Sequence, residues 1–536
     1  MAYIYIIYSL ILYVLFKIIK IISTYFLISP ELYKIPSLPL IISIKLNVGN
    51  YLLGVPFVTN IRNFLLEPLE ETGIVKYFDI LWQRWIIFVA EPKLLKEINL
   101  RSDLFQKIDA SNRPMSDCEF AYIGRKNILF ENKEEHLRHR RIANPSFHHI
   151  WPTELFGDII KELFKELDKD FKVNNTINIQ DMTQSFTLEA LGKAAFDYNF
   201  GAVQKSHTEL IKAHNETMRG ISNMNYVMFP VLEKIPGFKR THLFHNIKIL
   251  NNVILNIINK RKQKQQTLEN NNNNINLTSM NNSDDNYIKN NIVLTSKISE
   301  KHNDLLSYML KAEADETNLK KRLSTEELLN DLKVFLIAGH DSTAAAISAA
   351  IHYLGKNPEC QKKVREEVIS IIGDKKDDVI PTLEQIKEMK YINMVINETL
   401  RIHPPAPALN ARIAQKDTKL GEYVILKGQM IIPNIYALHH SKKIWGDEPY
   451  KFKPERFEKE TLKSSYNFIP FGGGVRICIG MNFSLAEQRV FLAMFVKKYQ
   501  WTIPKETIHN DKIEVNKTYL SLLVPRNLYA TFKRRY

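Results

Sequence analysis

The most informative segment of this chain is Phe471-Gly-Gly-Gly-Val-Arg-Ile-Cys-Ile-Gly480. It sets Cys478 in a glycine-rich loop that leads into an amphipathic segment, residues 481–499, with the apolar spacing of a helix. The positive end of a helix dipole and backbone N–H groups directed at the sulfur both favour a thiolate at this position. The loop therefore predicts an ionised, protected sulfur ligand.

The cysteine count narrows the kind of metal site. The chain has three cysteines, Cys118, Cys360 and Cys478, and no CxxC pair, so zinc sites and iron–sulfur clusters lack their usual ligand sets. A single thiolate suits an iron whose other positions are already filled, as in a haem held by one cysteine. Three unpaired cysteines also argue against a disulfide framework and favour a reducing compartment.

The loop also fits the pattern FxxGxRxCxG, at Phe471, Gly474, Arg476, Cys478 and Gly480. In this it resembles the haem-binding loop of the cytochrome P450 family. The resemblance implies a haem b cofactor (iron protoporphyrin IX) with the Cys478 thiolate as its axial metal ligand.

Further residues match family positions that bind the haem propionates. They are Arg476, Arg412 and a WxxxR motif at His136 and Arg140, in which histidine replaces tryptophan. A spacing of four places His136 and Arg140 on one helix face. The replacement keeps a hydrogen-bond donor and loses stacking area.

A long buried helix is predicted to begin at Ser324, which forms a capping-box pattern with Glu327, and to end at Gly355. Its apolar middle contains Ala338-Gly-His-Asp-Ser-Thr343, whose polar groups are costly to bury. Serine and threonine can bond back to the preceding turn and open a bulge with room for a small ligand and a water. From these residues alone, a helix kink satisfied by waters is the alternative.

The same hexapeptide resembles the oxygen-activation motif of the P450 family. The resemblance implies that Asp341 relays protons and that the Ser342 hydroxyl lies beside the bound oxygen, where the family usually has threonine. Serine lacks the β-methyl group that fixes the rotamer, so Thr343 is a candidate to share this role.

A third match is Glu398-Thr-Leu-Arg401, followed by Ile-His-Pro-Pro405. Glu398 and Arg401 lie on one helix face and can pair. They resemble the ExxR helix of the family, and residues 452–457 resemble the segment that supplies a second arginine, Arg456. The resemblance implies a buried network of Glu398, Arg401 and Arg456 that holds the Cys478 loop and serves folding and haem retention.

Helical periodicity dominates the chain, so the fold class is predicted as mainly α with small β-sheets (α+β). The resemblance implies the cytochrome P450 fold: a single large haem domain over residues 46–536, after an N-terminal membrane anchor (1–28) and a hinge (29–45). Residues 261–298 are rich in Asn and poor in apolar residues, and we expect a disordered insertion there within one domain.

The N-terminus is predicted to anchor the chain in a membrane. A spanning helix needs about 20 apolar residues, and residues 1–28 reach this length if Lys17 and Lys20 snorkel. A cleaved signal peptide is the alternative, but a basic n-region and an A-x-A cleavage site are both missing. Lys17, Lys20 and Lys34 follow the apolar run, which predicts a single-pass protein of the endoplasmic reticulum with its haem domain in the cytoplasm.

The formal net charge of +15 indicates affinity for acidic surfaces, meaning anionic lipid, an acidic protein or nucleic acid. The basic residues are dispersed, which argues against nucleic acid. No GxGxxG motif follows a strand, so a flavin or nicotinamide fingerprint is missing. The resemblance therefore implies electrons from NADPH through NADPH-cytochrome P450 reductase, with cytochrome b5 as a second candidate donor. Lys497, Lys498 and residues 138–141 are predicted to dock it.

Together these features predict a monooxygenase that inserts one oxygen atom from O2 into a lipophilic substrate, which the sequence does not identify. A haem-thiolate isomerase or dehydratase is one alternative, and Asp341 and Ser342 argue against it because such enzymes commonly lack both groups. A non-catalytic haem-binding membrane protein is the other. Consumption of NADPH and oxygen in the presence of a reductase would distinguish the monooxygenase from both alternatives.

Overall fold

The structure is a computed structural model of the 536-residue chain. It describes residues 8, 12, 15–16, 19–26, 28–80, 82–110, 115–148, 150–204, 209–221, 223–279, 304–318, 321–458, 466–509, 512–516 and 522–536.

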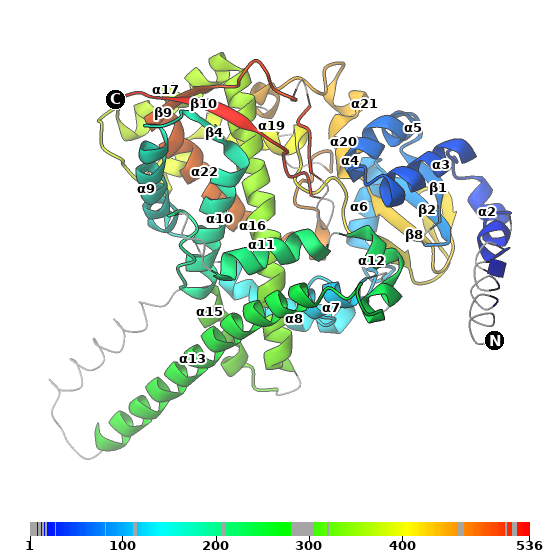
Figure 1. Cartoon of the computed structure of the whole chain (residues 1–536), viewed down its shortest axis with the longest axis horizontal. Helices are drawn as coiled ribbons and strands as arrows, with labels where there is room; N and C mark the ends of the chain where they lie inside the picture. Colours follow the sequence, from blue (N-terminus) through cyan, green and yellow to red (C-terminus); the bar gives the residue numbers. More distant parts are fainter. Residues whose placement is uncertain are drawn as a thin grey trace.

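Helices make up most of the described chain, as the sequence predicts (Figure 1). They are α2 (Pro30–Tyr33), α3 (Leu40–Asn47), η1 (Val48–Leu52), α4 (Phe57–Asn60), η2 (Ile61–Leu65), α5 (Leu66–Thr72), α6 (Pro92–Leu100), α7 (Asp117–Ile123), α8 (Lys133–His148), α9 (Thr153–Asp170), α10 (Ile179–Phe196), α11 (Glu209–Ile221), α12 (Met224–Met228), η4 (Pro230–Lys234), α13 (Thr241–Ser279), α15 (Leu305–Asp315), α16 (Thr325–Lys356), α17 (Pro358–Ile372), α18 (Leu383–Glu388), α19 (Lys390–Ile402), α20 (Ile435–His440), α21 (Lys442–Trp445), η6 (Pro454–Phe457), η8 (Gly474–Arg476) and α22 (Met481–Lys498).

The strands form small sheets at the periphery of the helical body. They are β1 (Ile74–Asp79), β2 (Arg84–Val89), β3 (Phe105–Lys107), β4 (Thr176–Asn178), β5 (Arg412–Ala414), β6 (Thr418–Leu420), β7 (Tyr423–Ile425), β8 (Met430–Pro433), β9 (Tyr499–Thr502) and β10 (Tyr529–Arg534). A five-stranded sheet has the order β1-β2-β8-β5-β3, a three-stranded sheet the order β4-β10-β9, and β6 pairs with β7. β2 and β8 are parallel and the other pairs are antiparallel. The mainly α class with small sheets is therefore confirmed.

Helix α16 runs through the middle of the body (Figure 1). The predicted capping box is present: the Ser324 hydroxyl accepts from the Glu327 N–H at 3.2 Å, and the Glu327 carboxylate accepts from the Ser324 N–H at 2.8 Å. Nearly every side chain from 327 to 355 is buried. α10 packs against it, and the buried hydroxyls of Thr183 and Ser348 lie 2.7 Å apart across this contact. α16 is therefore the fixed element against which the site is built.

Among the described helices, α16 alone is long and apolar enough to cross a bilayer, yet 78% of its apolar window is buried in the protein. It is the core helix. The anchor predicted over residues 1–28 falls mostly outside the described residues and stays a prediction.

The segment expected to be disordered, residues 261–298, begins inside α13. The structure continues that helix through residues 261–279, which differs from the prediction, while 280–298 lie outside the described residues. Helix propagation costs far less than nucleation, so a helix already formed on residues 241–260 extends into a polar sequence that would not start one.

Candidate active site

The Cys478 loop takes its shape from glycines. Gly472 and Gly474 have φ of +74° and +65°, and a Cβ on Gly474 would lie 2.4 Å from the backbone oxygen of Asn99. Only glycine fits this approach without strain. The Cys478 N–H donates to the Phe471 carbonyl at 3.0 Å, and Gly480 is the N-cap of α22. The predicted loop and following helix are thus in place.

The surroundings of the Cys478 thiol favour its ionisation less than the loop motif suggests. Burial raises the pKa of this thiol, while the Gly480 N–H, Arg140 and Lys107 lower it without reversing the balance. The side chain keeps accessible surface although surrounding protein desolvates it. Ionisation therefore needs the metal itself, since a coordinating thiol loses its proton on binding.

The middle of α16 has an accessible face, which we call the open face of α16. Ala338 is exposed and Gly339, Asp341 and Ser342 are half-buried, whereas the turns on either side are almost entirely buried. The Ser342 hydroxyl donates back to the Ala338 carbonyl at 2.5 Å. The back-bond that we expected is present, but the predicted bulge is not, because α16 keeps its helical course through residues 338–343.

The three predicted catalytic residues have different partners. Asp341 Oδ1 accepts a hydrogen bond from Gln184 of α10 at 2.8 Å and lies 3.5 Å from Nε2 of His340. The Thr343 hydroxyl is buried and donates to Ser484 of α22 at 3.0 Å. Thr343 therefore joins α16 to the helix that follows Cys478, and the open face of α16 carries Asp341 and Ser342.

A cluster of basic side chains lies near Cys478. Its members are Lys107, His136, Arg140, Arg412 and Arg476, which influence one another's pKa values or that of Cys478. Burial lowers the pKa of Arg412 to about 10, and burial with repulsion from Arg412 and Arg140 lowers that of Arg476 to about 9. His136 is neutral, because burial and the neighbouring cations lower its pKa to about 2.

Part of this cluster has no anion to bind within the described chain. Arg476 donates to the Glu131 carbonyl at 2.6 Å and to Asn132 at 2.8 Å, but its Nη1 meets no acceptor among the described residues. The same holds for Nε and Nη1 of the buried Arg412. Buried donors of this kind require acceptors, and the two propionates of a haem supply them. The residues present therefore fit a haem whose iron faces Cys478.

The predicted Glu398, Arg401 and Arg456 network exists. Arg401 and Glu398 form a bidentate pair at 2.7 and 2.8 Å, and both side chains are fully buried. Arg456 Nε lies 3.4 Å from Glu398, while its other nitrogens donate to the carbonyls of Trp445 and Glu448. The remaining Arg401 nitrogen donates to the His439 and Pro449 carbonyls at 2.8 and 2.7 Å.

His439 connects this network to the Cys478 loop, and sequence reasoning missed it. Its Nε2 accepts the Ile469 N–H at 3.1 Å, two residues before the loop begins, and its ring stacks on Phe468. The ring is fully buried, and burial with the nearby Arg401 lowers its pKa to about 3. Gln184 and Lys107 were also missed. Their partners are distant in sequence, so no local motif marks them.

The prediction that Lys497 and Lys498 form a docking surface for the reductase is wrong. Lys497 and Lys498 are buried, where Lys497 donates to the carbonyls of Lys375 and Asp377 and Lys498 pairs with Asp378 at 2.8 Å. Their long apolar stems allow such burial. Arg138 is likewise paired with Glu327 and Glu135.

Comparison with known proteins identifies the family of this chain. The family model described as cytochrome P450 matches residues 80–531. The chain belongs to the cytochrome P450 family. The family implies a haem-thiolate cofactor, in agreement with the P450 site described above.

Curated P450 relatives are distant in sequence. Cytochrome P450 72A68 of Medicago truncatula is 26% identical over 440 residues, which cover 79% of this chain and 75% of the relative. Echinocystic acid 23-monooxygenase of Saponaria officinalis is 27% identical over 442 residues, covering 79% and 76%. The bifunctional cytochrome P450/NADPH--P450 reductase of Bacillus cereus is 30% identical over 338 residues, which cover 61% of this chain and 27% of the relative.

Replacing Glu398 by glutamine should lower the free energy of unfolding by about 3–5 kcal/mol, because Arg401 would stay buried without its counter-charge. Denaturant unfolding measures this. The matched control is Glu366→Gln on α17, whose exposed pair with Lys362 should contribute less than about 1 kcal/mol. Equal losses in the two variants would contradict the structural role of the network.

His439 should make the fold acid-sensitive. Its pKa is about 3 in the folded chain against an ordinary 6.5, so only the unfolded chain takes up this proton as the pH falls below 6.5. Stability is therefore full above pH 6.5 and is lost toward pH 3, by up to about 1.4 kcal/mol per pH unit. Denaturant unfolding at several pH values should show a shallower loss for His439→Gln. The exposed His148→Gln variant should keep the wild-type slope.

Proposed function

We propose that this chain is a monooxygenase that transfers one oxygen atom from O2 to a lipophilic organic substrate. The observation that carries the proposal is that the open face of α16 presents the carboxylate of Asp341 and the hydroxyl of Ser342. Thr343 joins this helix to α22, the helix that follows Cys478. Each cycle consumes two electrons and two protons per O2: one oxygen atom enters the substrate and the other leaves as water.

One group of residues would hold the cofactor, and a second group would move protons. Cys478 would hold the iron, and Arg412, Arg476, Arg140 and His136 would bind the propionate side. When bound, the haem supplies the oxygen chemistry, and a thiolate ligand favours O–O cleavage. The chain itself must then deliver protons to the open face of α16.

Ser342 is placed for this delivery and Thr343 is not. The Ser342 Oγ hydrogen is directed to the Ala338 carbonyl, and a rotation about χ1 turns it toward the open space. The Asp341 carboxylate lies on the same open face, where it accepts a hydrogen bond from Gln184. The Thr343 hydroxyl is engaged with Ser484 and buried.

Electrons must come from a partner, and we propose NADPH-cytochrome P450 reductase, with cytochrome b5 as a second donor. The Bacillus cereus relative bears the names of both functions, which supports this pairing.

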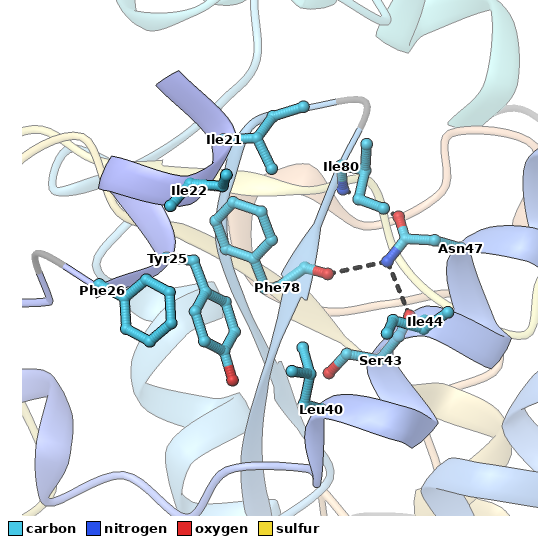
Figure 2. Close-up of a pocket in the computed structure, with 10 residues that line it drawn as sticks. All are labelled: Ile21, Ile22, Tyr25, Phe26, Leu40, Ser43, Ile44, Asn47, Phe78 and Ile80. Carbon is cyan, nitrogen blue, oxygen red and sulfur yellow. Dashed lines mark hydrogen bonds between the residues drawn. The ribbon is translucent and has the colours of Figure 1, made fainter. Parts of the chain in front are cut away.

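We also propose a single-pass anchor in the endoplasmic reticulum, with the haem domain in the cytoplasm. The described residues of the N-terminal segment include exposed apolar side chains at Leu12, Phe16 and Phe26. Residues 21–26 face α3 and β1 across an apolar cavity of about 240 Å³ (Figure 2). Its lining residues are Ile21, Ile22, Tyr25, Phe26, Leu40, Ser43, Ile44, Asn47, Phe78 and Ile80. Exposed apolar surfaces of this kind favour a lipid environment.

Replacing Cys478 by serine tests the proposal as a whole. The variant should lose the absorbance band of a thiolate-bound, carbon monoxide-ligated haem and the NADPH-driven consumption of O2 with reductase. Cys360→Ser is the matched control, since this thiol lies on α17, outside the site. Unchanged spectrum and turnover in Cys478→Ser would contradict a haem-thiolate centre. Wild-type protein that binds haem without consuming O2 would exclude the monooxygenase.

Ser342→Ala should retain haem but lower product formed per NADPH by about 10²-fold, the usual effect of losing a positioned proton donor. Product and hydrogen peroxide are measured together, because electrons that do not reach the substrate leave as peroxide. Ser348→Ala, on the same helix but bonded to Thr183, should keep the wild-type ratio. If Thr343→Val lost the coupling and Ser342→Ala did not, proton delivery would belong to Thr343.

A further inference from the structure

The apolar cavity beside the N-terminal segment contains none of the residues assigned above to the haem site. It lies between helical residues 21–26, helix α3 and strand β1, and its volume is about 240 Å³ (Figure 2). Tyr25 lines one side of the cavity, Leu40 and Ile44 of α3 line the other, and Phe78 of β1 lies between them. Three segments that are separate in the sequence therefore enclose one space.

The polar groups in the wall of this cavity are turned away from the space. The Asn47 side-chain amide donates to the Ser43 carbonyl at 2.7 Å and to the Phe78 carbonyl at 2.8 Å, and its side-chain oxygen accepts the Ile80 N–H at 2.8 Å. The Ser43 hydroxyl is buried and has no accessible surface. A ligand in the cavity would therefore contact apolar surface only.

An apolar space of this size favours a hydrocarbon ligand. Apolar cavities stay dry, and a cavity of about 150 Å³ lined by aliphatic and aromatic side chains binds benzene. In proportion, a cavity of about 240 Å³ has room for roughly ten carbon atoms. This is the size of a segment of a lipid acyl chain.

Exposed apolar side chains surround the cavity and continue toward the N-terminus. Ile22, Phe26 and Leu40 line the cavity and are each at least 50% exposed. Phe16 and Ile19, which precede them in the proposed membrane anchor, are equally exposed. An apolar surface that continues from an anchor to a cavity indicates contact with the membrane, where acyl chains are the nearest hydrocarbon.

Basic residues adjoin the cavity on both of the helices that enclose it. Lys20 and Lys45 are exposed, and they are the sequence neighbours of the lining residues Ile21 and Ile44. Neither residues 19–26 nor α3 contain an acidic residue. Basic side chains at a membrane surface attract anionic lipid headgroups, so the charge around the cavity complements a lipid phosphate.

We propose that this cavity binds one acyl chain of an anionic phospholipid, with the headgroup near Lys20 and Lys45. This inference rests on the proposed membrane anchor. The Tyr25 ring stacks on Trp85 with ring centroids 5.2 Å apart, which holds residues 21–26 against the body of the protein. The bound acyl chain fills the remaining space and joins the anchor to α3 and β1.

Photo-crosslinking in a membrane tests this site. The full-length protein is placed in phosphatidylcholine vesicles containing phosphatidylserine with a diazirine at the end of one acyl chain, and mass spectrometry locates the label. Label on Phe78 is the decisive result, because this side chain lines the cavity and is only 4% exposed. We expect this label in the wild-type protein, and its absence would overturn the inference.

Two tryptophan variants of α3 provide the matched comparison. Ile44→Trp places an indole at the cavity and should lower the label on Phe78 about fivefold, because the larger side chain occupies the space. Ile41→Trp makes the same change at an exposed residue that does not line the cavity, and should keep the wild-type label. Equal labelling of Phe78 in the two variants would overturn the inference.

Two further arms test the headgroup. The wild-type protein should be labelled more by the phosphatidylserine probe than by a phosphatidylcholine probe, and the double variant Lys20→Gln, Lys45→Gln should lose this preference. A preference that persists would overturn the role of the two lysines. If diazirine-labelled decanoic acid labels Phe78 and neither phospholipid does, the cavity binds free fatty acids and the phospholipid proposal is wrong.

The anchor and the lipid site fail in distinguishable ways. A full-length protein that does not sediment with the vesicles would contradict both proposals. A protein that sediments with them but carries no label on Phe78 would retain the anchor and exclude the lipid site.

Discussion

The buried pair of Arg401 and Glu398 is the constraint on which the rest of the structure depends. Neither side chain reaches solvent, and a buried pair of this kind persists only if its remaining hydrogen-bond groups are satisfied. Satisfying them draws in the carbonyls of His439 and Pro449 and the N–H of Lys453. His439 then fixes Ile469, just ahead of the Cys478 loop. The position of Cys478 therefore depends on an ion pair that lies on a different helix.

Local sequence patterns predicted the parts of the site that depend on neighbouring residues. The glycines around Cys478, the capping box of α16 and the i, i+3 pair of Glu398 and Arg401 each involve residues close in the chain. The same holds for the helical fold class, since helices arise from local periodicity.

The parts that were missed depend on contacts between distant residues. Lys107 joins the basic cluster near Cys478 only because β3 pairs with β5, and His439 contacts Arg401 only because α20 meets the end of α19. Lys497 and Lys498 have the composition of a surface pair, but carbonyl and carboxylate groups near residues 375–378 bury them. Composition gives the charge of a side chain and not its surroundings.

The pairing of β3 with β5 has a consequence for assembly. In this register Lys107 lies directly opposite Arg412, so two basic side chains face each other across neighbouring strands. Like charges in this relation destabilise the pairing of an edge strand, and burial together with repulsion from Arg412, Arg476 and Arg140 lowers the pKa of Lys107 well below its ordinary value. A haem propionate bound near Lys107 and Arg412 would offset this repulsion, so haem binding would stabilise the margin of the five-stranded sheet.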